Sequence, residues 1–143
     1  MGHVRQQIRE QAALALQSVP LVLRNVFQSR VYPLSEDELP AILITTDGEQ
    51  IEPNTISGLL ERNVLLTLAI KAKAFNDLDD TLDTISESIE KAMANDTSLS
   101  LKNALLSEVE VALSGDGDQP IGTCTLRYQV VVFTNRNAPE TLL

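Results

Sequence analysis

Regular alternation of apolar residues between positions 62 and 73 constrains this chain more than any other feature of its sequence. Five apolar residues recur at every second position: Val64, Leu66, Leu68, Ile70 and Ala72. Because successive side chains of a strand point to opposite faces, this spacing predicts a strand with one apolar face. Leu65 and Ala69 make the second face partly apolar as well. We therefore expect a central strand, or one that a partner partly covers.

Two prolines shape the stretch from residue 25 to residue 46. Pro33 and Pro40 each push the preceding residue out of the helical region, so a helix cannot run through this stretch. Short strands are predicted at Val26–Val31 and Ala41–Thr46, joined by an acidic link. In the second strand, the β-branched residues Ile42 and Ile44 are expected to share one face.

Two segments have the apolar spacing of amphipathic helices. The first covers residues 3–18 or so and ends before Pro20. The second begins at a cap formed by Asn76 or Asp77 and runs for about eighteen residues. Its buried stripe is predicted to contain Leu78, Leu82, Ile85, Ile89 and Met93.

A long hairpin is predicted near the carboxyl end. Residues 105–114 and 121–134 both alternate, and GDGDQP at 115–120 supplies the turn between them. Val109, Val111 and Leu113 are expected to point inward. Together, these elements predict an α+β fold, with a mostly antiparallel sheet of about five strands and two helices packed on one face.

The length of 143 residues predicts a single domain spanning 1–143. Within it, residues 47–61 (DGEQIEPNTISGLLE) have turn formers at both ends and are expected to form a long loop or arm. This arm either becomes ordered by contact with a neighbouring subunit or is a flexible surface loop without a partner. Residues 135–143 (NRNAPETLL) have no periodicity and are predicted to be a mobile tail, or one docked on a partner.

Charge and composition exclude several functions. The net charge of −9 argues against a protein that grips duplex DNA, which needs a cationic surface. Two tyrosines, three phenylalanines and no tryptophan make a base-stacking platform a poor interpretation. No apolar run is long enough to span a membrane, so no membrane partner is expected.

Single reactive residues do not add up to a catalytic site. His3 is the only histidine and lies at the amino end, so it cannot build a relay or a zinc site. Cys124, the only cysteine, is predicted to be a small core residue of a strand. The Gly115–Asp118 segment resembles part of a calcium loop, but two carboxylates are too few, and a hairpin turn explains it better.

Four aspartates crowd the start of the second predicted helix: Asp77, Asp79, Asp80 and Asp83. Pairs three residues apart share a helix face and could hold Mg²⁺. Capping and the helix dipole explain the cluster without a metal, and pairing with basic residues of a neighbouring subunit is a further use. With no recognised catalytic motif, we expect neither an enzyme nor a cofactor.

Several segments resemble a known family. They are residues 26–44 (VFQSRVYPLSEDELPAILI), 62–74, 77–83 (DLDDTLD) and 108–117 (EVEVALSGDG) with the strand that follows. Together they resemble the tail terminator family of long-tailed phages and prophages, also called tail completion or minor tail protein U-like proteins. The resemblance runs from the first helix to about Phe133 and consists of structural elements rather than catalytic ones.

The resemblance implies a prophage-encoded α+β subunit that assembles as a homohexameric ring. Such a ring caps the head-proximal end of the tail tube, ends its polymerisation and offers a surface for joining the head. The implied partners are further copies of the chain, the major tail tube protein and a head-completion or connector protein. DNA would pass through the lumen without specific binding. The implied locations are the bacterial host cytoplasm during assembly and then the virion tail.

Candidate contacts with a neighbouring subunit or the tube lie on the arm and on the second helix: Glu49, Ile51, Glu52, Asn54, Ile56, Leu59, Leu60, Asp79 and Asp80. Two alternatives stay open. A head–tail connector or neck subunit of similar fold would bind the portal side instead of the tube. A small-molecule-binding α+β domain would need a polar pocket.

Overall fold

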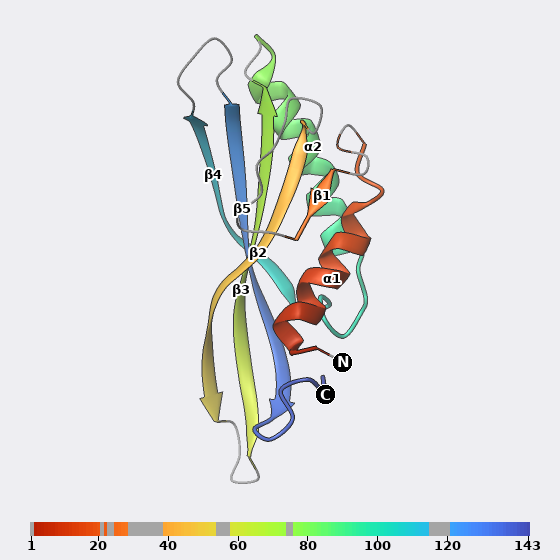
Figure 1. The fold of residues 1–143 in the computed structure, drawn as a ribbon, viewed down its shortest axis with the longest axis vertical. Coiled ribbons are helices and arrows are strands. Elements are labelled where there is room, and N and C mark those ends of the chain that lie inside the picture. The colour runs from red at the N-terminus through yellow and green to blue at the C-terminus, as the bar shows by residue number, and fades with distance from the viewer. Residues whose placement is uncertain are drawn as a thin grey trace.

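The computed structural model describes residues 2–20, 22, 25–28, 39–53, 58–73, 76–114 and 121–143. The elements in chain order are α1 (Val4–Leu16), β1 (Val26–Phe27), β2 (Ala41–Pro53), β3 (Leu59–Lys73), α2 (Leu78–Ala94), β4 (Ala104–Ser114) and β5 (Ile121–Asn135). The strands form one open sheet in the order β1-β2-β3-β5-β4, and both helices cover the same face (Figure 1). Among the strand pairs of the described residues, β1–β2 is parallel and the other three are antiparallel. The predicted fold class is confirmed.

β3 is the central strand, which is one of the two positions that its apolar face and its partly apolar second face predicted. It pairs antiparallel with β2 on one side and with β5 along its whole length on the other. All five alternating apolar residues from Val64 to Ala72 are buried on the face that the helices cover. Leu65 and Ala69 are half-buried on the opposite face. The sheet is therefore built around the strand with the clearest alternation.

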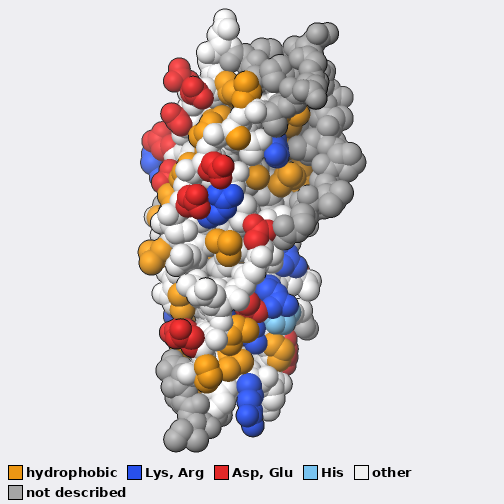
Figure 2. Space-filling view, turned by 90° about the vertical axis from the view of Figure 1, so that its left-hand side faces the viewer, with side chains coloured by type: hydrophobic (Ala, Val, Ile, Leu, Met, Phe, Trp, Pro, Cys, Tyr) orange, Lys and Arg blue, Asp and Glu red, His pale blue; other side chains and the backbone are white. Residues whose placement is uncertain are grey.

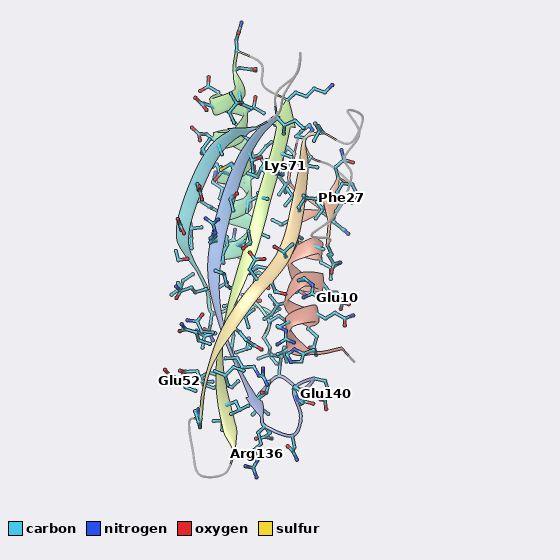
Figure 3. All side chains as sticks on the ribbon, turned by 60° about the vertical axis from the view of Figure 1, so that its left-hand side comes forward. Glu10, Phe27, Glu52, Lys71, Arg136 and Glu140 are labelled. Carbon is cyan, nitrogen blue, oxygen red and sulfur yellow. The ribbon has the colours of Figure 1, made fainter. Side chains whose placement is uncertain are left out.

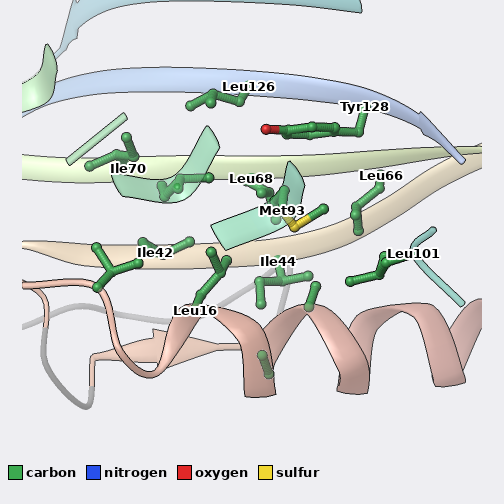
Figure 4. Packing of buried hydrophobic residues seen from close by; sticks show 14 of the residues in the cluster. Leu16, Ile42, Ile44, Leu66, Leu68, Ile70, Met93, Leu101, Leu126 and Tyr128 are labelled. Carbon is green, nitrogen blue, oxygen red and sulfur yellow. The ribbon is translucent and has the colours of Figure 1, made fainter. Parts of the chain in front are cut away.

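The core lies between the sheet and the two helices (Figure 4). Leu82, Ile85, Ile89 and Met93 of α2 are buried, and Leu78 packs against the core at the helix start. Ile42 and Ile44 of β2 are buried side by side on one face, as expected. Cys124 is also a core residue, and burial raises the pKa of its thiol. α1 supplies its own apolar stripe, which contains Val4, Ile8, Ala12, Ala13 and Leu16.

The expectation of a loop at 47–61 is wrong for the described residues. β2 continues to Pro53 and β3 begins at Leu59, so most of this segment is a paired hairpin, which we call the arm hairpin (48–53 and 58–63). Asp47-Gly48, which resembled a turn, is a β-bulge between Thr46 and Gly48. Gly48 has a φ of +158°, which side chains rarely adopt. Figure 1 shows this hairpin extending past the start of α1.

The first strand is shorter than predicted within the described residues. It covers Val26–Phe27 and pairs with Ile42 and Leu43, and Gln28 has no strand structure. Residues 29–31 of the predicted strand lie outside the described part of the chain. One short pairing therefore marks this edge of the sheet.

The carboxyl-terminal segment is docked on its own chain, so the prediction of a mobile tail is wrong. The backbone N–H of Val4 donates to the Pro139 carbonyl at 2.9 Å, and Gln7 Nε2 donates to the Glu140 carbonyl at 2.7 Å. Leu142 packs against the core. Because the first turn of a helix has unsatisfied N–H groups, the Pro139 carbonyl supplies a partner that α1 lacks within the helix. Such backbone contacts leave no periodic signal in the sequence.

The inward apolar face expected for β4 is exposed instead. Val109, Val111 and Leu113 do lie on the helix side of the sheet, because they pair with Leu126, Cys124 and Gly122 of β5. They are exposed because α2 lies mainly over β3 and β5 and leaves the edge strand largely uncovered. Alternation thus predicted the correct face of β4, and its burial was predicted wrongly.

Candidate functional site

A buried charged network lies at the base of the arm hairpin. Arg62 Nη1 is 3.0 Å from Glu49 Oε1, and Arg62 Nε donates to Thr134 Oγ1 at 2.9 Å. Arg5 of α1 pairs with the same Glu49 oxygen. We call these four residues the anchor network. It joins α1, β2, β3 and β5, and so fixes the arm hairpin against the first helix.

The network is almost closed to solvent. The Glu49 and Arg62 side chains are only 8% and 7% exposed, whereas Arg5 is 41% exposed. Glu49 Oε2 is buried without a hydrogen-bond partner among the described residues. A buried carboxylate of this kind depends on its cations, because leaving it unpaired is strongly unfavourable. Glu49 therefore pairs within its own subunit, and its contact with a neighbouring subunit stays a prediction.

Sequence reasoning missed Arg62, although a signal for it was present. Arg62 is in phase with Val64 and Leu66, so alternation places it on the buried face of β3. Charged residues are rarely buried unless they are paired. An arginine at a core position therefore predicts a buried carboxylate nearby. The sequence did not identify Glu49 as that carboxylate, because the bulge at Asp47 reverses the alternation before it.

The remaining arm residues divide by exposure. Ile51 is 44% exposed and Glu52 is exposed, while Leu59 and Leu60 are half-buried. Asn54 and Ile56 lie outside the described residues. At the base of the turn, Gly58 has a φ of +90° and its carbonyl accepts from the Arg136 N–H at 2.8 Å. Figure 3 shows that both Glu52 and Arg136 lie toward this end of the molecule.

Asp79 and Asp80 are exposed in the first turn of α2. Figure 1 places this turn at the opposite end of the sheet from the arm hairpin, so the structure does not bring the two candidate regions together. Asp77 is the residue before the helix, and its side chain makes no capping hydrogen bond. Among the described residues, no group of three His, Cys, Asp or Glu side chains is arranged to hold a metal ion.

His3 caps α1. Its Nδ1 accepts a hydrogen bond from the Arg5 backbone N–H at 3.1 Å, which satisfies one donor of the first turn. Burial, and after it the positive charges of Arg5 and Arg62, lower the pKa of His3 below its usual 6.5. The neutral imidazole is therefore the form that the fold stabilises.

We expect the chain to lose stability through His3 as the pH falls. Because the pKa of His3 is lower in the folded state, the unfolded chain binds more protons between the two pKa values. The contribution of neutral His3 to the free energy of unfolding is fully present above about pH 6.5, the unfolded-state pKa. It is lost as the pH falls from there through the folded-state pKa. Urea unfolding at about pH 7.5 and about pH 5.5 measures this loss, and His3→Asn, which keeps a capping acceptor, should lose less. Equal losses in both proteins would contradict this role of His3.

Pockets give no support to a small-molecule site. Two of the surface hollows in the described part of the chain have volumes of about 290 and 300 Å³, one beside Gly48, Asn63 and Gln129, the other beside Pro40, Lys73 and Thr81. Both are at or below the usual lower limit for ligand sites. Figure 2 shows apolar side chains scattered among charged ones on the helix-free face of the sheet.

None of the described helices has the length and apolar composition needed to cross a membrane.

Comparison with known proteins gives a match to a family model. The family model described as "Phage minor tail protein U" matches residues 3–132. Among solved structures, the chain is similar to a protein chain in "Virion of native gene transfer agent (GTA) particle", with 14% identity and a TM-score of 0.49. That alignment covers 90% of this chain and 92% of the other. No curated protein matched the chain.

Proposed function

This chain belongs to the phage minor tail protein U family, whose members are structural proteins of the virion tail, and from that premise we propose that it forms a ring capping the tail tube. The ring is a homohexamer at the head-proximal end of the tube. It ends polymerisation of the tube and offers the surface to which the head is joined. Residues 1–143 act as one domain in this assembly.

The observation that carries the proposal is the arm hairpin. It extends beyond the helices, and the anchor network ties its base to α1 through the Arg5–Glu49 ion pair and to β5 through Arg62 and Thr134. Ile51 and Glu52 are exposed near its end, where the subunit has no further layer to bury them. A projection anchored in this way suits a contact with another protein, because little conformational entropy is lost when it binds. We propose that residues 47–61 contact a neighbouring subunit or the last ring of the tube.

The acidic character of the chain supports a conduit for DNA. With a net charge of −9, a ring of these subunits has no general attraction for phosphate. DNA then passes through the lumen without being held by the wall. The other partners in this proposal are the major tail tube protein and a head-completion or connector protein. Assembly takes place in the bacterial host cytoplasm, before the chain becomes part of the virion tail.

A tube-growth assay tests this function. Tail tube protein that polymerises in the presence of the chain should give shorter tubes with a ring at one end, measured by negative-stain electron microscopy. Heat-denatured chain is the matched control and should leave the tube lengths unchanged. Tubes of unchanged length without bound rings would contradict the proposal. Binding to a portal-side connector but not to the tube would favour the neck subunit instead.

A further inference from the structure

β4 presents an unusual edge to solvent. It is the last strand of the sheet, and its large apolar side chains are exposed: Leu105 by 71%, Leu106 by 38%, Val109 by 47%, Val111 by 54% and Leu113 by 64%. All except Leu105 pair with residues of β5 that face the helices, so they form a continuous stripe on one side of the strand. We call Leu106, Val109, Val111 and Leu113 the β4 stripe. Long apolar edge strands are templates for pairing with another chain.

Carboxylates lie on both sides of the β4 stripe. On the helix side, Asp83 and Glu90 of α2 are exposed. Both lie close enough to Cys124, the register partner of Val111, to affect its thiol. Burial raises the pKa of this thiol most, and the negative charges of Asp83 and Glu90 raise it further. On the other face, Glu108 and Glu110 are exposed and share one cation, Arg127, at 3.5 and 3.2 Å. Whatever covers this edge must supply apolar surface together with positive charge.

The opposite edge of the sheet is less acidic and offers an arginine. In the described part of α1 and β1 the charged side chains are Arg5, Arg9 and Glu10, and Arg5 is paired with Glu49. Residues 77–114, which contain α2 and β4, carry nine carboxylates and two lysines. Figure 3 shows β4 on one side of the sheet and α1 with Phe27 on the other. A hollow of about 240 Å³ lies at this second edge and is lined by Arg9, Gln28 and residues 44–46.

We propose that the acidic β4 edge of one copy docks onto the α1–β1 edge of the next copy, with the β4 stripe covered and the carboxylates beside it facing Arg9. The occupant is a second copy of this chain because the chain itself carries both complementary edges. The two edges differ, so the contact is heterologous, and repeating it with one rotation closes a ring. The inference rests on the proposed ring and names the surfaces that form it.

Val111→Glu tests the β4 edge. The exposed valine is not needed for the core, but a carboxylate in the β4 stripe adds buried negative charge to an acidic edge. The dissociation constant between subunits should rise at least ~100-fold, as measured by analytical ultracentrifugation. Val111→Thr, which keeps the shape and the β-branch, is the matched control and should retain rings. Unchanged circular dichroism and thermal midpoints establish that both variants fold.

Mixing two edge variants tests the head-to-tail geometry. Arg9→Glu/Gln28→Glu makes the α1–β1 edge acidic, while Gln28→Lys alone is the control with the opposite charge and should keep or tighten the ring. Val111→Glu and Arg9→Glu/Gln28→Glu should each be monomeric. Their mixture should give a one-to-one heterodimer that cannot grow, because each supplies the intact edge that the other lacks. Native mass spectrometry identifies this species by its mass.

Other outcomes overturn the inference in distinguishable ways. If wild-type protein and Val111→Glu both form rings, the β4 edge is not the subunit contact, and the proposed function stands. If Val111→Glu forms rings that no longer bind tubes, the occupant of the edge is the tube protein. If Arg9→Glu/Gln28→Glu still forms homodimers, two β4 edges pair with each other. If wild-type protein stays monomeric with and without tube protein, the proposed function fails and this inference falls with it.

Discussion

Replacing Arg62 by methionine should lower the free energy of unfolding by about 3 kcal/mol, a large share of the stability of a domain of this size. Methionine has a similar volume, so the expected loss is electrostatic rather than a cavity. The Glu49 carboxylate would stay buried with only the half-exposed Arg5 as its cation, and Thr134 would lose its donor. Urea unfolding followed by circular dichroism measures the change.

A double-mutant cycle separates the ion pair from general damage. Glu49→Gln removes the charge that Arg62 neutralises, so the double variant Glu49→Gln/Arg62→Met should be more stable than the sum of the two losses predicts. The expected coupling is about 1 kcal/mol or more, in the range found for contacting groups. Strictly additive losses would mean that the pair does not act as a unit and that the anchor network is wrongly assigned.

Shortening the arm hairpin should abolish capping of tubes and leave a folded protein. Replacing residues 53–60 by Asn-Gly provides a two-residue hairpin turn and retains both Glu49 and Arg62. The side chains of the anchor network and of the core are retained, while the hydrogen bond from the Arg136 N–H to the Gly58 carbonyl and the pairing of Leu59 and Leu60 with β5 are lost, so the thermal midpoint should fall only slightly. The lost part carries four of the proposed arm contacts, Asn54, Ile56, Leu59 and Leu60, and the retained Ile51 and Glu52 no longer lie on a long projecting hairpin. Tube lengths measured by electron microscopy should match those of tubes grown without the chain.

A finer pair of variants tests the same contact at one residue. Ile51→Lys places a charge at the exposed apolar position of the arm, whereas Ile51→Val keeps its apolar character. Capping should be weakened by the first change and retained with the second. A shortened arm that still caps tubes normally would show that assembly contacts lie elsewhere on the subunit.

Local signals predicted the layers of the fold well. β3 alternates without interruption from Arg62 to Ala72, and α2 repeats its apolar residues at helical spacing, so both were identified from neighbours in the sequence. The arm hairpin escaped prediction because the bulge at Asp47 interrupts the alternation of β2 and the following residues resemble turn formers. Propensity alone cannot distinguish a bulged strand from a loop.

The candidate site depended on information that no local pattern contains. Glu49 and Arg62 meet because β2 and β3 pair in one register, and Arg5 reaches them from a helix far away in the sequence. Likewise, alternation placed Val111 on the correct face but did not reveal that the helix layer ends before β4. Burial depends on which elements are neighbours in space, and that information comes only from the tertiary structure.

Native mass spectrometry of the purified chain, with and without the major tail tube protein, measures whether the chain forms the proposed ring and whether that ring binds the tube. We expect a closed homohexamer, formed by the chain alone or on addition of tube protein, and a complex of that ring with the tube protein. A strict monomer that ignores the tube protein under both conditions would contradict this expectation.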